Sequence, residues 1–436
     1  MSEKSHAGSA SAVALVVANM IGTGVFVSLH YQLFDFHAAP PILLLWIVGG
    51  LISLCGALCY ATLAKALPRS GGEYHYLTEL YHPSLGFMSG LLSAVVGFAA
   101  PTAISALALG RYLHSSQDWV RPDVAAYTVI ILGTLAHAMS ARTSGRVQVA
   151  ATSIKLTLIV GFLIAAVVLP GKGDIRWLPE AGDAKAIWNP AFATALMFVF
   201  YAYSGWNAAV YGLEEWQRPE STVKRALIGG SLLVMFLYIG LNAAFLKAAP
   251  VADLAANEEI ADAAARSLFG PAAARWTSGL LAIGLFSSVS ALLWAGPRVL
   301  GSMGRDVAAL RWFAPKDGVP LNALVFQTVL ALAFVWFGQL DTLVNYTQSG
   351  LTLCSALAVA GIFILRRRGQ ASAPHLILSL IFIGMAGFVI LQSLVKEFTR
   401  PAPADGYHLA SFPTLCGLLT ALACALLWFP LNRKSP

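Results

Sequence analysis

The chain has 436 residues, of which 58% are hydrophobic and 11% are charged, and its formal net charge is +7. A soluble domain carries about 25% charged residues, so this composition excludes an ordinary soluble globular protein. Many apolar runs reach the roughly 20 residues that a helix needs to cross a bilayer. The sequence therefore predicts an all-α membrane protein that crosses the membrane many times.

Apolar runs bounded by charged residues, proline and glycine predict twelve transmembrane helices in one domain that fills residues 1–436. No small-residue cleavage site follows the first run, so we interpret it as a helix rather than a signal peptide. The twelve runs lie near residues 9–33, 40–66, 84–112, 122–141, 146–170, 190–211, 223–248, 271–302, 319–338, 341–367, 373–396 and 408–430.

The distribution of basic residues predicts the orientation of these helices. If the N-terminus is inside, most of the 28 lysine and arginine residues fall on the inner side. By the positive-inside rule, both termini are expected in the cytoplasm. The net positive charge then follows from topology and does not indicate nucleic-acid binding.

The first run has Gly22-Thr23-Gly24 at its middle, where two glycines weaken a helix. Glycines alone could mark a close helix crossing. The sixth run, however, has Ser204-Gly205-Trp206 at its middle and Pro219 at its end. Breaks in the first and sixth of twelve spans are expected of two inverted copies, near 9–170 and 190–367, with two helices near 373–430 appended.

Such breaks have a chemical consequence. Backbone N–H and C=O groups that lose their helical partners cannot remain without hydrogen bonds in hydrocarbon, so they line a cavity or bind a ligand. The half-helix that begins after the first break presents N–H groups, which suit a carboxylate. The half-helices that end before each break present carbonyls, which suit an ammonium. Together they predict a receptor for a zwitterion.

The segments that carry the breaks resemble a known family. NMIGTGVF (19–26) and YAYSGWNAAVYGLEE (201–215) are similar to signatures of the amino acid–polyamine–organocation (APC) superfamily, closest to its L-amino-acid transporter (LAT) branch. The resemblance implies a leucine-transporter-like fold with a five-plus-five inverted repeat, broken helices 1 and 6, and amino-acid transport. Further similar stretches are PRSGGEYHYL (68–77), RVQVAATSIKL (146–156), PRVLGSMGRD (297–306) and YTQSGLTLCSALAVAGIFILRRR (346–368).

The resemblance implies substrate-binding residues at both breaks. The substrate carboxylate is expected at the amides of Gly22, Thr23 and Gly24, with the Thr23 hydroxyl as a further donor. An aromatic side chain at the position of Tyr201 closes over the substrate in the family, although plain packing among neighbouring aromatic rings is the alternative. The substrate ammonium is expected at the main-chain carbonyls of Met20, Ile21, Tyr201, Ala202 and Ser204.

Lys155 is the one charge in the middle of a predicted span, since the other charges lie near span ends. It lies about 13 Å along the helix from Arg146, which places it near the middle of a ~30 Å hydrocarbon core. Ionisable groups at this depth are usually functional. By resemblance, this lysine stands where sodium-coupled relatives bind a cation, which implies a fixed positive charge or a proton carrier. A structural link between spans 1 and 5 is the alternative.

Two acidic residues, Glu214 and Glu215, end span 6 close to Arg218. They form either an inner gate or a solvated charge cluster at a helix end, and the cluster is slightly favoured. Leu213 replaces a threonine that is common at this point in the family, and we assign it no consequence.

Other residue patterns argue against metal, cofactor and enzyme chemistry. The histidines and cysteines form no ligand motif, and no nucleophile or phosphate-binding motif is present, so no metal, no cofactor and no enzymatic activity are predicted. The five cysteines fall inside predicted spans, where core packing is expected. They are Cys55, Cys59, Cys354, Cys416 and Cys424.

The predicted function is secondary active transport of neutral L-amino acids, small to medium in size, by alternating access. Sodium-independent exchange and proton-coupled uptake both remain open. The uncharged runs 85–110 and 278–297 would offer no carboxylate to a cationic side chain. Ser204 stands where some relatives that accept cationic substrates have aspartate. Alternatives are a membrane amino-acid sensor that uses the same pocket, and a transporter of cationic amino acids or polyamines.

The expected partners are an amino-acid substrate and the lipid bilayer, without nucleic acid. Eukaryotic family members that pair with a heavy chain carry a cysteine in the external loop after span 3. The corresponding stretch here, GRYLHSSQDWVRPD (110–123), contains none. No disulfide-linked heavy chain is therefore expected, and a bacterial inner membrane is the predicted location.

Overall fold

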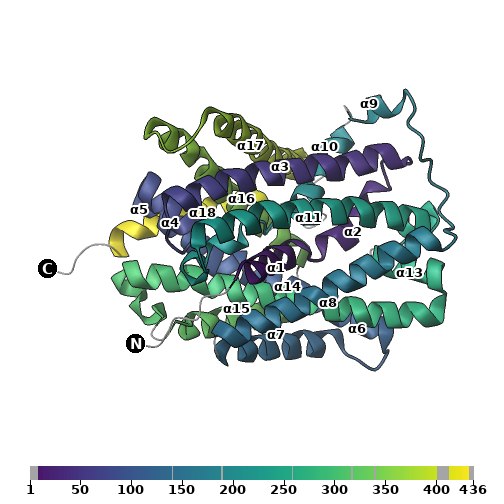
Figure 1. Cartoon of the computed structure of the whole chain (residues 1–436), viewed down its shortest axis with the longest axis horizontal. Coiled ribbons are helices and arrows are strands. Elements are labelled where there is room, and N and C mark those ends of the chain that lie inside the picture. Colours follow the sequence, from purple (N-terminus) through teal and green to yellow (C-terminus); the bar gives the residue numbers. More distant parts are fainter. Residues whose placement is uncertain are drawn as a thin grey trace.

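The computed structural model describes residues 8–139, 141–187, 190–257, 259–315, 318–337, 340–399 and 412–431. Across these residues the secondary structure is helical, and no β-strand is present. The predicted all-α class is confirmed. Most of the longer helices run roughly along the long axis of the molecule (Figure 1).

The structure contains eighteen α-helices among the described residues. Their bounds are α1 Ser9–Met20, α2 Gly24–Gln32, α3 Ala39–Ala66, α4 Glu73–Leu80, α5 Pro83–Leu92, α6 Ala99–Ser116, α7 Pro122–Met139, α8 Ala141–Val168, α9 Asp183–Ile187, α10 Pro190–Ala202, α11 Pro219–Ala248, α12 Val251–Ala255, α13 Ile260–Phe269, α14 Pro271–Asp306, α15 Leu321–Phe337, α16 Leu340–Arg367, α17 Ala373–Thr399 and α18 Pro413–Leu431.

Ten helical stretches of the described chain are long and apolar enough to cross a membrane. Two further apolar helices are shorter, at Ala191–Ala202 and Leu321–Phe337, and they correspond to the sixth and ninth predicted spans. The sixth is shorter than predicted because the helix ends at Ala202, whereas the apolar run continues to residue 211. These helices support a protein that crosses the membrane many times.

Proline marks several helix starts, as expected for a residue whose missing N–H has no helical acceptor there. It occupies the first or second position of α3, α5, α11 and α14. The third predicted span contains a feature that the sequence does not signal. A π-helical turn at Ser93–Gly97 separates α5 from α6, and such turns are frequent at functional sites.

The first and sixth apolar runs both contain a helix end. Helix α1 ends at Met20 and α2 begins at Gly24. Helix α10 ends at Ala202, and short 3-10 turns follow before α11. Gly205 in this segment has a φ of +94°, which favours glycine. A Cβ there would also lie 2.9 Å from the carbonyl of Asn19, so the turn after α10 packs directly on the end of α1.

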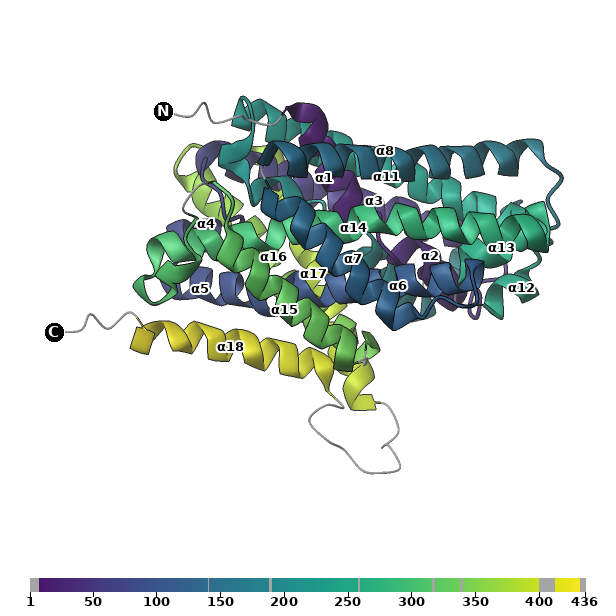
Figure 2. The same ribbon diagram turned by 90° about the horizontal axis from the view of Figure 1, so that it is seen from below.

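These helix ends lie inside the bundle. Helix α1 packs against α8, α11 and α14, and α10 packs against α2 and α3. Figures 1 and 2 both place α4 toward one end of the long axis and α13 toward the other. The two helix ends are therefore surrounded by long helices rather than by surface loops.

Candidate substrate site

The ends of α1 and α10 border a cavity of about 140 Å³. Its walls come from the predicted spans 1, 3, 6, 8 and 10, with Glu73 and Phe382 in addition. The lining residues are Asn19, Met20, Gly22, Thr23, Gly24, Glu73, Ser93, Gly97, Phe98, Pro101, Ile104, Ser105, Phe200, Tyr201, Ala202, Ser204, Gly205, Trp206, Asn207, Ala208, Tyr211, Ser288, Leu292, Gln348, Leu351, Thr352, Cys354, Ser355 and Phe382.

Most of the predicted substrate-binding residues meet at this cavity. Ile21 is the exception, because it is fully buried and does not line the cavity. The predicted residues that do line it are Met20, Gly22, Thr23, Gly24, Tyr201, Ala202 and Ser204.

The start of α2 offers unused hydrogen-bond donors beside the cavity. Among the residues that the structure describes, the N–H groups of Thr23, Gly24 and Val25 have no acceptor. The first N–H groups of a helix lack helical partners, and they carry the positive end of its dipole. This arrangement is chemically suited to an anion such as a carboxylate.

The carbonyls at the ends of α1 and α10 already have internal donors. The Tyr238 hydroxyl of α11 lies 2.6 Å from the Met20 oxygen and 3.0 Å from the Ala202 oxygen. The Tyr201 oxygen accepts a bond of 2.9 Å from the Ser204 amide. A carbonyl oxygen has two lone pairs. The oxygens of Tyr201 and Ala202 can therefore each accept one further donor, such as an ammonium.

Lys155 lies beside the break in the first span rather than in the cavity wall. It is 3% exposed, and its Nζ donates to the Ile21 oxygen at 2.5 Å and to Ser288 Oγ at 2.7 Å. Ser288 Oγ in turn donates to the same Ile21 oxygen at 2.8 Å. The Nζ of Lys155, from α8, thus links the end of α1 to α14. The Ile21 carbonyl is occupied by these two donors.

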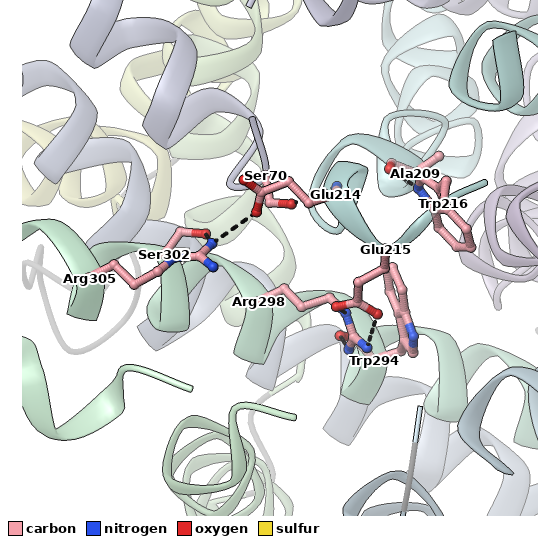
Figure 3. Close-up of polar contacts among 9 residues, drawn as sticks. All are labelled: Ser70, Ala209, Glu214, Glu215, Trp216, Trp294, Arg298, Ser302 and Arg305. Carbon is pink, nitrogen blue, oxygen red and sulfur yellow. Dashed lines mark hydrogen bonds and ion pairs between the residues drawn. The ribbon is translucent and has the colours of Figure 1, made fainter. Parts of the chain in front are cut away.

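The two predicted gate residues pair with arginines of α14 rather than with nearby Arg218. Glu215 accepts two bonds from Arg298, at 2.7 and 2.8 Å (Figure 3). The Arg298 guanidinium lies 3.6 Å over the ring of Trp294, which stacks on Trp216. Two-point pairing of this kind is the strongest arrangement of guanidinium and carboxylate. The segment after α10 is therefore fastened to α14.

Glu214 makes a looser contact from the same segment. Arg305 lies 3.4 Å from its carboxylate, and the Glu214 amide donates to Ser70 Oγ at 3.0 Å (Figure 3). The loop after α3 is also tied to the end of α14, because Arg69 pairs with Asp306 at 2.5 Å. Three segments that are distant in the sequence therefore meet at one end of the cavity.

Tyr74 strengthens this junction. Its hydroxyl donates to the Asp306 carboxylate at 3.0 Å. Burial, followed by the neighbouring Asp306 carboxylate, raises the pKa of Tyr74 above its usual value. The hydroxyl therefore keeps its proton at neutral pH and remains a donor to Asp306.

A carboxylate that the sequence analysis did not single out also lines the cavity. Glu73 is the first residue of α4, and it is buried in the cavity wall. Its Oε1 accepts a bond of 2.7 Å from the Tyr60 hydroxyl and one of 2.5 Å from Asn207 Nδ2. The cavity is therefore not free of acidic groups.

Comparison with known proteins places the chain in a family. Residues 8–430 match the model of a family described as amino acid permease. The chain belongs to this amino acid permease family. The APC resemblance of the two break motifs is thereby confirmed, and the permease has relatives in the LAT branch.

Two kinds of relative resemble the permease over most of its length. The large neutral amino acids transporter small subunit 2 of Oryctolagus cuniculus is 28% identical over 411 residues, which cover 90% of this chain and 76% of the relative. The human protein of the same name is 28% identical over 413 residues, with coverage of 90% and 76%. The b(0,+)-type amino acid transporter 1 of Mus musculus is 25% identical over 426 residues, with coverage of 94% and 86%.

Sequence patterns missed three residues of the permease that the structure brings to the site. Tyr238 is one of several polar residues in its span, together with Ser231 and Asn242, so its hydroxyl alone is a weak signal. Glu73 lies outside the apolar runs, where the sequence gives no sign that it reaches the cavity. Nothing in the sequence separates Arg298 from the other basic residues of the predicted inner side, although it pairs with Glu215.

Proposed function

We propose that this permease is a secondary active transporter that carries neutral L-amino acids across the cytoplasmic membrane by alternating access. The observation that carries the proposal is the pairing of two helix ends on one cavity. The free N–H groups at the start of α2 suit the substrate carboxylate, and the carbonyls at the end of α10 suit its ammonium. Family membership supports an amino acid as the substrate.

We assign the substrate contacts within this receptor. The free amides of Thr23, Gly24 and Val25 receive the carboxylate, with the Thr23 hydroxyl as a further donor, whereas the Gly22 amide already donates to the Met20 oxygen at 2.8 Å. The carbonyls of Tyr201, Ala202 and Ser204 receive the ammonium, because each of these oxygens can accept another donor. The Tyr201 ring closes over the bound substrate.

The proposed architecture has twelve spans in one domain, with both termini in the cytoplasm. In it, α1 with α2 forms broken helix 1, and α10 with the turns that follow forms broken helix 6. The two repeats occupy residues 9–170 and 190–367. The support is that both helix ends border one cavity, as expected for a midplane site between two inverted repeats.

Selection for neutral side chains cannot rest on an absence of carboxylates, because Glu73 lines the cavity. Ser204 still provides no charge at the break of span 6. The facing walls are largely apolar, with Phe98, Ile104 and Leu351 among them. A charged side chain placed against such walls loses hydration, which costs several kcal/mol.

A competition panel tests this selectivity. We expect alanine and serine to inhibit uptake of labelled L-alanine by proteoliposomes about tenfold more strongly than lysine, arginine or glutamate, which corresponds to about 1.4 kcal/mol. Leucine and phenylalanine should rank between these groups. Strongest inhibition by lysine or arginine would replace the proposal with transport of cationic amino acids.

We also propose that the Glu215–Arg298 pair keeps the cytoplasmic side of the cavity closed, with Glu214–Arg305 as a weaker second pair. The Arg298 side chain is 9% exposed and that of Glu215 is 31% exposed. Removal of one partner of a buried pair costs about 3–5 kcal/mol. Partial exposure of Glu215 places the expected cost at the lower end of this range. Loss of the pair should therefore favour the inward-open state.

Cys354 lines the cavity and provides a reporter for this opening. In a variant that keeps only this cysteine, Glu215→Gln should raise its reaction rate with an impermeant thiol reagent, added from the cytoplasmic side, by about tenfold. Glu220→Gln is the matched control, because its pair with Lys65 is exposed on both sides and such pairs contribute about 0–1 kcal/mol. Equal rates in the two variants would refute the gate.

A further inference from the structure

Glu73 has one satisfied and one unsatisfied oxygen. The residue is 3% exposed and lines the cavity. Its Oε1 holds both hydrogen bonds, from Tyr60 and Asn207. Its Oε2 is buried and has no hydrogen-bond partner. A buried polar atom without a partner is unfavourable, so a proton or another donor that reaches this oxygen from the cavity would stabilise it.

The groups that face Glu73 offer no positive charge. The titratable side chains that interact with it are Tyr60 of α3, Tyr76 of α4, Tyr211 of the segment after α10, and Cys354 of α16. All four are neutral at neutral pH. The nearby arginines are engaged elsewhere. Arg69 pairs with Asp306, and Arg298 pairs with Glu215. Among the described residues, Glu73 forms no ion pair.

The geometry leaves Oε2 of Glu73 as an open acceptor in the cavity wall. Both donors of the protein lie on the other oxygen, Oε1. A proton on Oε2 would therefore occupy the position at which the carboxyl group has no partner, without displacing either bond.

We propose that Glu73 takes up a proton at Oε2 from the external side and releases it to the cytoplasm, so that each amino acid crosses together with a proton. This inference rests on the proposed function. With Oε2 protonated, the closed cavity contains no unpaired charge at this position. When the contacts of Glu215 and Arg298 separate, water reaches Oε2 and the proton leaves. The remaining carboxylate is then hydrated.

Uptake by proteoliposomes without sodium tests the proposal in two modes. Exchange is measured with unlabelled alanine inside and equal pH on both sides. Accumulation is measured in empty proteoliposomes with an acidic exterior. The wild type should perform both. In Glu73→Gln, Oε1 can still accept both bonds while a fixed amide replaces the titratable oxygen. Relative to the wild type, the accumulation rate of this variant should fall about tenfold further than its exchange rate.

Two further variants separate a proton site from a structural role. Glu79→Gln is the matched control, because Glu79 lies on the same helix and is exposed, and it should behave like the wild type. Glu73→Asp keeps a titratable group in altered surroundings. The external pH of half-maximal uptake should therefore shift in this variant, which a purely structural role would not produce. If Glu73→Gln fails to fold, the shift of the pH profile in Glu73→Asp still tests the proposal.

Several outcomes would overturn the inference. One is that the wild type exchanges alanine but does not accumulate it on the pH gradient. Another is that Glu73→Gln has the same ratio of accumulation to exchange as the wild type. An unshifted pH profile in Glu73→Asp would also contradict it, as would accumulation that requires sodium. Absence of exchange in the wild type would instead refute the proposed function, so the two failures are distinguishable.

Discussion

Replacing Gly24 by valine should abolish exchange of L-alanine. A Cβ at this position would lie 2.7 Å from the Ala202 Cα and 2.8 Å from the Ala202 Cβ. Real side chains do not approach so closely, so α2 would have to move away from α10. The proposed carboxylate and ammonium sites lie at the ends of these two helices. When bound groups must be placed exactly, a displacement of about 1 Å lowers a reaction rate by about 10²-fold. We expect the rate of L-alanine exchange to fall by a similar factor.

Two alanine variants provide the comparison. Gly24→Ala adds the same Cβ without the branched methyl groups. Because the Cβ itself meets Ala202, this variant should already lose most of the exchange activity. Gly229 lies in α11, and a Cβ there would meet nothing within 4 Å. Gly229→Ala should therefore keep wild-type exchange. Uptake is measured per amount of correctly inserted protein. Wild-type exchange by Gly24→Val would show that the contact between α2 and α10 is not needed.

Lys155→Ala should reduce exchange by about 10²-fold, while wild-type uptake should be equal in sodium and choline buffers. The Lys155 ammonium contacts the Ile21 oxygen and Ser288 Oγ, and it supplies a positive charge at the break of span 1. We propose that this charge replaces a bound sodium ion. Loss of the ammonium leaves Ser288 as the one remaining donor to the Ile21 oxygen among the described residues, which loosens the proposed carboxylate site.

Lys247→Ala is the control for removal of a lysine. The Lys247 ammonium also donates to backbone carbonyls, those of Ala166 and Val167, but it does not line the cavity. Its replacement should affect exchange far less than Lys155→Ala does. Wild-type uptake that disappears when sodium is removed would exclude a fixed ammonium as the substitute for sodium.

The sequence could predict where the chain departs from regular helix, because the causes are local. Gly22 and Gly24 lie where α1 gives way to α2. Gly205 lies in the turn after α10, at a φ that other residues rarely adopt. Pro219 begins α11. Glycine and proline act through their own backbone, so their effect can be inferred without knowledge of the fold.

The contacts between distant segments could not be predicted in the same way. Tyr238 reaches Met20 across 218 positions of the chain, and Glu73 is bonded to Asn207 across 134. Such pairs depend on how the helices are rotated and shifted against one another. Apolar periodicity leaves this undetermined, because the spans are apolar on most faces. For the same reason, the sequence places Glu214 and Glu215 next to Arg218 but does not indicate their partners in the structure, Arg305 and Arg298.

Uptake of labelled L-alanine into proteoliposomes that contain unlabelled L-alanine tests the proposed transport most directly, with L-alaninamide as the competitor. We predict uptake well above that of protein-free liposomes. The amide should inhibit it about tenfold less than L-alanine does, because it lacks the carboxylate that the N–H groups of Thr23, Gly24 and Val25 would bind. Binding of alanine without any uptake would contradict transport and favour a sensor, and equal inhibition by the amide would contradict the carboxylate site at the start of α2.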